Sequence, residues 1–394
     1  MTDNNAPNPS ATPTSDYRDA DSFQIEAQGH AFTFYPSGSD RLEALLDHIR
    51  KAESSVHTFY YRFQDDVAGT KVRDALVEAA DRGAEVSLII DHFGSDTPLS
   101  FFNPILEAGG KFALFSPKWN VRYLVRNHQK FVIVDDARVM TGGANVSDQY
   151  FNGPEDNGWC DLGLAIEGPV VSRFSEWFGI ITEWIESDGS QFRKLRRMIR
   201  DWDPGDGPVQ LLLGGPSIRT RHWALELKKD LVHASRFDQI SAYFTPPRSI
   251  QRLVRNVAQR GEVRLITAGK SDIDATIAAA RLLYRPLLKA GAKIAEFLPC
   301  KLHMKLLVVD DTSYFGSANM DKRSIRINVE LMIRVEDAAL AKRLREFLDH
   351  LEAASRPVTP EWYAKQATLP ARLRWRGAYA LAIADYWLTR KLTR

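Results

Sequence analysis

The sequence predicts an α/β protein built from two similar lobes that are related by a pseudo-twofold axis. Helix-like and strand-like segments alternate along the chain, and one set of polar motif residues occurs twice, 175 residues apart. At 394 residues the chain also exceeds the size at which a single hydrophobic core usually stops growing. We therefore expect one fold unit used twice, with the functional side chains where the two copies meet.

Both halves contain the same order of predicted elements. The first half has helical spacing of apolar residues at 41–52 and 72–82, and strand-like runs at 56–61 and 86–91. The second half has helices at 224–235 and 250–260, and strands at 239–244 and 263–268. Gly83 and Gly261 follow the second helix of each half, where glycine is a common stop.

Composition shifts mark the domain boundaries. Residues 201–208 are dense in turn formers, so we predict a first lobe at 26–204 and a second lobe at 205–356. Residues 1–25 are predicted to be a disordered tail, because their start is rich in Asn, Pro, Ser, Thr and Asp and lacks the basic and apolar parts of a signal peptide. Residues 357–394 are predicted to form a basic, aromatic C-terminal helix.

Overall charge and cysteine usage narrow the function classes. A net charge of +2, without a long Lys/Arg run across the repeat, disfavours a nucleic-acid partner. The two cysteines, Cys160 and Cys300, do not make a disulfide framework, and we expect them to be buried thiols in a reducing compartment. No apolar run approaches the 18 residues typical of a membrane span.

The repeated motif has the spacing H-x-K-x4-D. Its residues are His128, Lys130 and Asp135 in the first copy, and His303, Lys305 and Asp310 in the second. Each copy begins a short apolar run and leads into a glycine turn that ends in Asn145 or Asn319. Because residues two apart in a strand share a face, we expect His and Lys to point together and Asp to face away and fix backbone.

Two His and two Lys that converge from related lobes suit phosphodiester chemistry. The ammonium groups can neutralise charge that grows on phosphate oxygens. One neutral imidazole can attack phosphorus while the other, protonated, gives its proton to the leaving alkoxide and then acts as a base. This chemistry requires no metal and no cofactor, and the sequence has no H-E-x-x-H or clustered Cys/His site.

Two pairs of polar residues occupy equivalent positions in the two halves and are candidates to support the motif histidines. Asp161 follows His128 by 33 residues and Glu330 follows His303 by 27, each in an apolar segment, so they are candidates to orient the imidazoles. Taken alone, each is more simply interpreted as a solvated acid at a strand end, but their parallel placement after both motifs favours the orienting role. Asn145 and Asn319 can bind a phosphate oxygen or brace the turn, and the sequence leaves both interpretations open.

The motif pair with its glycine turns resembles the phospholipase D superfamily. The sequence segments around the motifs resemble bacterial cardiolipin synthases of the type without N-terminal transmembrane helices. The segments that carry the resemblance are Asn127-His128-Gln129-Lys130, Gly142-Gly143-Ala144-Asn145, Leu302-His303-Met304-Lys305, Gly316-Ser317-Ala318-Asn319 and Asn328-Val329-Glu330. The similarity extends over roughly residues 30–350. It implies two αβα sandwich lobes, a site between them and a phosphohistidine intermediate, with His128 as the nucleophile.

The resemblance also implies a reaction. A phosphatidyl group moves from phosphatidylglycerol to His, glycerol leaves, and a second phosphatidylglycerol accepts the group to give cardiolipin at the cytoplasmic side of the bacterial membrane. The first alternative is a phospholipase D that hydrolyses phospholipids to phosphatidic acid, and the second is a nuclease of the same superfamily. A catalytically inactive binding module is the least expected, because all four His and Lys residues are present.

Two further features of the sequence bear on how lipid reaches the site. Transfer to an alcohol requires that water be kept out of the site. Aromatic segments at 101–102, 112–119 and 177–178 are candidates for a site entrance that does so, although such segments taken singly are more often part of the core. Residues 372–394 hold six Lys/Arg against one Asp around an almost uncharged stretch. They are expected to lie on an anionic membrane surface or, alternatively, to dock on the protein.

Overall fold

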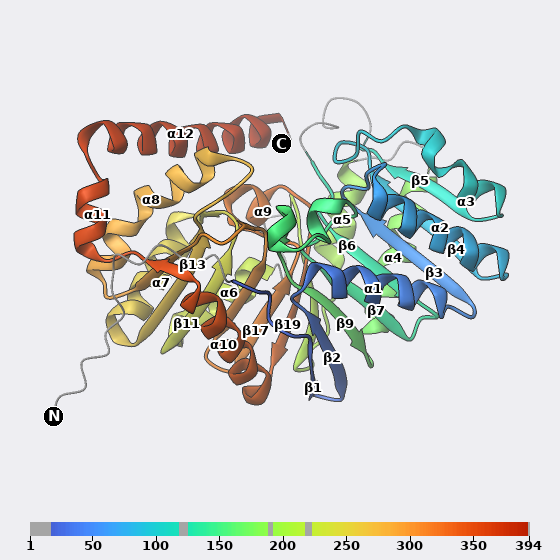
Figure 1. Ribbon diagram of the computed structural model, residues 1–394, viewed down its shortest axis with the longest axis horizontal. Helices are drawn as coiled ribbons and strands as arrows, with labels where there is room; N and C mark the ends of the chain where they lie inside the picture. Colours follow the sequence, from blue (N-terminus) through green and yellow to red (C-terminus); the bar gives the residue numbers. More distant parts are fainter. Residues whose placement is uncertain (1–16, 118–124, 188–191, 217–222, 393–394) are drawn as a thin grey trace.

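The computed structural model describes residues 17–117, 125–187, 192–216 and 223–392, and it shows two lobes side by side (Figure 1). Each lobe contains an eight-stranded mixed sheet. The first sheet has the order β1 (Phe23–Ala27), β2 (His30–Tyr35), β9 (Gly163–Glu167), β7 (Arg138–Gly142), β6 (Lys130–Val134), β3 (Ser55–Tyr60), β4 (Glu85–Asp91), β5 (Lys111–Phe115). The second has the order β10 (Val209–Gly214), β19 (Glu330–Glu336), β17 (Thr312–Gly316), β16 (Lys305–Val309), β11 (Arg236–Ser241), β13 (Glu262–Ala268), β14 (Lys293–Phe297), β20 (Ser355–Pro357).

The two sheets repeat the same topology over seven strands, from β2 to β5 and from β10 to β14. In both, a parallel trio follows a set of antiparallel strands, so β3–β4–β5 corresponds to β11–β13–β14. Only the edge strands β1 and β20 lie at opposite ends of their sheets. The predicted α/β class and the duplication are therefore confirmed.

Helices cover both faces of each sheet. On the outer face of the first sheet lie α1 (Gly38–Arg50), α2 (Val67–Asp81) and α3 (Asn103–Glu107). On the outer face of the second lie α6 (Trp223–His233), α7 (Arg248–Arg260), α8 (Asp274–Lys289) and α12 (Leu369–Leu392). The layer between the sheets contains α4 (Val171–Glu186), α5 (Phe192–Asp201) and α10 (Ala338–Ala353), whose apolar faces share one core cluster with strands of both lobes.

Strand alternation explains how one short motif strand serves two cores. In β6, Phe131 and Ile133 point into the central layer between the lobes, whereas Val132 and Val134 point to the outer layer. In β16, Leu306 and Val308 occupy the central layer in the same way. A strand that is buried on both faces needs apolar residues at every position, and each motif Lys is accordingly succeeded by four apolar residues.

The ends of the chain differ from the prediction. The expected tail through residue 25 is wrong for residues 17–25, because Tyr17 packs edge-on against Phe297 at 5.1 Å and β1 begins at Phe23. Residues 1–16 lie outside the described residues. At the other end, α11 (Pro360–Gln366) precedes α12, which lies along α8 (Figure 1). Among the helices described, none is both long enough and apolar enough to cross a bilayer.

Candidate active site

Both motif histidines lie at the junction of the lobes, each just before its motif strand. The backbone N–H of His128 donates to the carbonyl of Val329, 2.8 Å away in the second lobe. The N–H of His303 donates to the carbonyl of Cys160, also 2.8 Å away, in the first lobe. The short strands β15 (Lys301–Leu302) and β8 (Trp159–Cys160) pair in parallel across the junction, and an isolated bridge joins the equivalent segments on the other side.

This pairing delivers a carboxylate from each lobe to the imidazole of the other, because Glu330 follows Val329 and Asp161 follows Cys160. Nδ1 of His128 lies 3.3 Å from Oε2 of Glu330, and Nδ1 of His303 lies 2.7 Å from Oδ2 of Asp161. Both carboxylates are fully buried. Nδ1 is therefore engaged on each ring, and Nε2 is the nitrogen left for chemistry.

Further hydrogen bonds fix the two carboxylates. Ser317 Oγ donates to Glu330 at 2.5 Å, and the Leu162 N–H donates to Asp161 at 2.8 Å. The glycine turn of the first motif requires glycine at position 143, because a Cβ on Gly143 would lie 2.4 Å from an Asp161 oxygen. Burial opposes ionisation of Asp161 and Glu330, but the charges and hydrogen bonds of the adjacent His and Lys groups hold the pKa of both below its ordinary value.

The motif lysines open β6 and β16 and are almost completely buried. Each ammonium group donates to the main-chain carbonyl of its own motif His, and Nζ of Lys305 lies 2.8 Å from Nδ1 of His303. Burial lowers the pKa of Lys130 to about 7 and that of Lys305 to about 8. Burial, then the neighbouring Lys, lowers the pKa of each imidazole to about 4. A bound anion opposes this lowering.

The motif aspartates act on backbone, away from the histidines. Asp135 accepts hydrogen bonds from the N–H groups of Glu53, Ser54 and Ser55, and Asp310 accepts from those of Ser235 and Arg236. Both have positive φ, +54° and +45°, because they lie in the turn after the strand. The turn, and not strand alternation, therefore directs these side chains.

The two motif asparagines differ. Asn145 braces the structure, since its Oδ1 accepts from the Arg62 N–H at 3.1 Å and its Nδ2 donates to the Tyr150 hydroxyl at 3.0 Å. Asn319 Oδ1 is buried without a hydrogen-bond partner in the described part of the chain. Both residues line the same cavity as the histidines.

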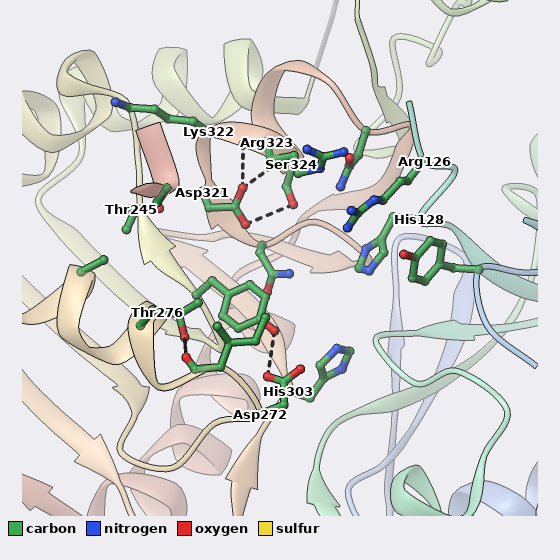
Figure 2. Close-up of a pocket in the computed structure, with 18 of the residues that line it drawn as sticks. Arg126, His128, Thr245, Asp272, Thr276, His303, Asp321, Lys322, Arg323 and Ser324 are labelled. Atoms are coloured by element: carbon green, nitrogen blue, oxygen red, sulfur yellow. Dashed lines mark hydrogen bonds between the residues drawn. The ribbon is translucent and has the colours of Figure 1, made fainter. Parts of the chain in front are cut away.

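A cavity of about 560 Å³ joins the two imidazoles (Figure 2). In Figure 2, His128 and His303 lie on one side and Thr276 on the opposite wall. The predicted histidines therefore meet at one cavity, with Lys130 and Lys305 buried behind them. Within the described residues, no three His, Cys, Asp or Glu side chains gather as a metal site.

The aromatic site entrance predicted from the sequence lies elsewhere. Phe101, Phe102, Trp177 and Phe178 are buried core residues, and none of the 112–117 residues lines the cavity; residues 118 and 119 lie outside the described residues. Other aromatic rings face the histidines: Tyr61 is 4.8 Å from His128, and Tyr150 and Trp159 are 5.1 and 5.3 Å from His303, between ring centroids.

Sequence reasoning also missed three arginines that line the cavity, Arg62, Arg126 and Arg323, of which Arg126 and Arg323 lie on the His128 side in Figure 2. These residues do not form a run in the sequence, because two come from the first lobe and one from the second. A signal was present for Arg323, which lies four residues after the second glycine turn, Gly316-Ser317-Ala318-Asn319. Spacing alone did not assign it a role.

The chain is similar to known phospholipid enzymes. The family described as "Cardiolipin synthase, PLD-like domain" matches residues 45–180 and 227–352. Cardiolipin synthase 1 of Bacillus cereus is 33% identical over 313 residues, which are 75% of this chain and 61% of that protein. The major cardiolipin synthase ClsA of Bacillus subtilis is 32% identical over 341 residues, which are 84% of this chain and 70% of that protein. This chain thus spans less than two thirds of the Bacillus cereus relative.

The fold has a solved counterpart. The crystal structure of phosphatidylserine synthase from Haemophilus influenzae superposes with a TM-score of 0.71, covering 94% of this chain and 96% of that one at 13% identity. At that identity the likeness shows a shared fold. It agrees with the two-lobed architecture described above.

Proposed function

Since the chain belongs to the phospholipase D-like family of cardiolipin synthases, we propose that it transfers a phosphatidyl group between two phospholipids through a phosphohistidine. The donor and the acceptor are both phosphatidylglycerol, and the products are cardiolipin and glycerol. The observation that carries this proposal is the pair of imidazoles at one cavity, each held through Nδ1 by a buried carboxylate of the opposite lobe.

The first half-reaction forms the covalent intermediate. Nε2 of His128 attacks phosphorus, the bond from phosphorus to the glycerol oxygen breaks, and His303 gives its proton to that oxygen. The shorter carboxylate contact of His303, 2.7 Å against 3.3 Å, supports it as the acid, because the contact favours the imidazolium form. Lys130 and Lys305 neutralise charge on the non-bridging oxygens.

The second half-reaction reverses these roles. His303, now neutral, takes the proton from a hydroxyl of the second phosphatidylglycerol, whose oxygen attacks phosphorus and releases His128. The rings of Tyr61, Tyr150 and Trp159 around the imidazoles support transfer over hydrolysis, since they reduce the room for water. The enzyme is proposed to work peripherally at the cytoplasmic side of the membrane, where anionic lipid is both substrate and docking surface.

Product analysis tests the proposal. Purified protein is incubated with phosphatidylglycerol in mixed micelles, and lipid and water-soluble products are measured together. Cardiolipin and glycerol in equal amounts support phosphatidyl transfer. Phosphatidic acid in place of cardiolipin would show a hydrolytic phospholipase D with the same site. If neither cardiolipin nor phosphatidic acid forms, the proposal is contradicted.

A further inference from the structure

The active-site cavity has two unlike walls. The wall that carries the histidines is polar and cationic, with Arg62, Arg126 and Arg323 among its residues. The opposite wall is built from Ile273, the start of α8 and the middle of α12. Apart from Thr276, the side chains of this wall are apolar: Ile273, Ala275, Ala279, Ala378, Leu381 and Ala382; Asp272, which precedes Ile273, also lines the cavity. A ligand that fills the whole cavity must therefore combine an anionic group with an apolar part.

Helical spacing explains why this wall is continuous. Ala378, Leu381 and Ala382 have i, i+3 and i+4 positions on α12, and Ala275 and Ala279 have i and i+4 positions on α8, so each set shares one helix face. Four of the lining residues are alanine, and these small side chains leave room in the cavity. The wall also opens to solvent, because Ile273 is 49% exposed and Leu381 is 69% exposed.

The wall is held in place by packing outside the cavity. Trp375, one turn before Ala378, is 1% exposed and lies 5.6 Å from the Tyr363 ring of α11. Lys322 lies over the Tyr379 ring at 5.4 Å, which ties α12 to α9 (Lys322–Arg326) beside the cavity. The middle of α12, around Ala378, therefore has a fixed position opposite the histidines.

We propose that α8 and α12 form the path by which the acyl chains of the donor phospholipid leave the active site toward the membrane. This inference rests on the proposed function and adds which part of the lipid this surface binds. The occupant follows from continuity, because the apolar wall and the two imidazoles bound one cavity and the wall ends at exposed Ile273 and Leu381. The glycerol backbone lies at the transition between the walls, and the chains lie along the alanines.

A matched pair of variants on α12 tests the path. Ala382 and Ala380 are both exposed, but only Ala382 lines the cavity. Ala382→Trp fills the path, whereas Ala380→Trp places the same indole on another face of the same helix. Initial rates are measured for dihexanoyl- and dioleoyl-phosphatidylglycerol, each dispersed in the same detergent micelles.

The expected result is a change in acyl-chain selectivity. In Ala382→Trp, kcat/KM for the dioleoyl donor falls about 10-fold relative to the dihexanoyl donor, because the loss of contact with two methylene groups has roughly that effect. Ala380→Trp keeps the wild-type ratio. Equal ratios in all three proteins, or an equal loss with both donors in Ala382→Trp, would overturn the acyl path.

The outcome is separable from failure of the proposed function. Turnover of the dihexanoyl donor by wild type and both variants reports the phosphatidyl-transfer chemistry and correct folding. If wild type converts neither donor, the proposed function fails and the acyl path fails with it. If wild type converts both and the Trp variants behave alike, the chemistry stands and only the acyl path is wrong.

Discussion

At the scale of single residues, the two carboxylates that hold the imidazoles cross from one lobe to the other. We predict that Asp161→Asn and Glu330→Gln each lower turnover roughly 10²- to 10⁴-fold, the range of a lost general acid or base. Without the carboxylate charge the imidazolium is less stable, so the alkaline limb of the pH–rate profile should move to lower pH in Asp161→Asn. An unchanged profile with reduced activity would indicate a purely structural role.

The histidines should behave as one unit. We expect His128→Ala and His303→Ala each to abolish turnover, and the double variant to be little worse than either single one, because the covalent route needs both groups. Trapping the intermediate with radiolabelled substrate, followed by peptide mapping, identifies the nucleophile. A phosphohistidine at His303 would reverse the assigned roles.

The motif aspartates should matter for stability. Backbone donors outweigh burial and lower the pKa of Asp135 to about 2, below its ordinary 3.8. A depressed carboxyl pKa means that its contribution is present above about pH 4 and is lost as pH falls through about 2. We predict that Asp135→Asn and Asp310→Asn each lower the free energy of unfolding by roughly 1–3 kcal/mol. Denaturant titration measures this; normal stability with lost turnover would contradict it.

Anion binding should take up protons. At pH 8, Lys130, with a pKa of about 7, and Lys305, with a pKa of about 8, are partly neutral in the free site, and at pH 6 both are largely charged. An anion favours the charged forms, so the lysine share of proton uptake should increase from pH 6 to pH 8. Calorimetric titration with tungstate in buffers of different ionisation enthalpy measures the uptake, and Lys130→Met should reduce the increase.

The sequence predicted which residues form the site, but it did not predict which carboxylate pairs with which histidine. The spacing identified His128 and His303, since two strands with the same motif imply the same local structure. Pairing of Asp161 with His303 depends on the register of β8 against β15, which is set by the packing of the two lobes. No local pattern encodes that register.

At the scale of secondary-structure elements, apolar periodicity located the elements but not their ends. The helix expected from residue 72 begins at Val67, because the Asp66 side chain caps it by accepting from the Gly69 N–H at 2.9 Å. The strand expected at 239–244 is β11, Arg236–Ser241, and Phe244 pairs with Met320 in a separate ladder. Polar caps and turns decide such limits.

The α12 helix combines both interpretations of the C-terminal segment. It docks on the protein through Trp375, while Leu369, Leu373 and Leu381 are exposed. Membrane binding remains a prediction. Deleting the whole helix would be a poor test of it, because that change also uncovers the pocket that Trp375 fills.

Neutralising exposed cations of α12 is the better test. We predict that Arg372→Gln, Arg374→Gln and Arg376→Gln together weaken binding to phosphatidylglycerol vesicles, since each surface cation contributes about 1 kcal/mol near anionic lipid. The loss should shrink as salt increases. Sedimentation with vesicles of graded phosphatidylglycerol content measures it.

The control for this experiment neutralises Arg50, Lys51 and Arg82 in the first lobe, away from the cavity lining. It changes the net charge equally. If both triple variants lose the same affinity, general charge drives binding. If the α12 variant sediments like wild type at every salt concentration, α12 is a structural helix only.

At the scale of the whole molecule, the lobes share one core. The central cluster combines Phe131 and Trp177 from the first lobe with Leu306 and Leu344 from the second. The duplication predicts two similar halves, and two halves could each have folded alone. A strand that is buried on both faces has a continuous apolar run, and such a run does not indicate which face contacts the partner lobe. The shared layer was therefore not predictable from the sequence.

We predict that the shared layer makes unfolding a single cooperative transition. Separating the lobes would expose Phe131, Trp177 and their neighbours on one side and Leu306 and Leu344 on the other, and apolar surface of that size is unfavourable in water. Calorimetry of the full chain should give one transition whose calorimetric and van't Hoff enthalpies agree.

Fragments of the chain provide the complementary measurement. Residues 17–204 and 205–394, expressed separately, should bind a hydrophobic dye and lack a cooperative transition, whereas coexpression should restore a complex and the crossed pairs His128–Glu330 and His303–Asp161 with it. Activity should therefore return only in the complex. Two separable calorimetric transitions, or a fragment that folds alone with a cooperative transition, would show that each lobe has a sufficient core of its own.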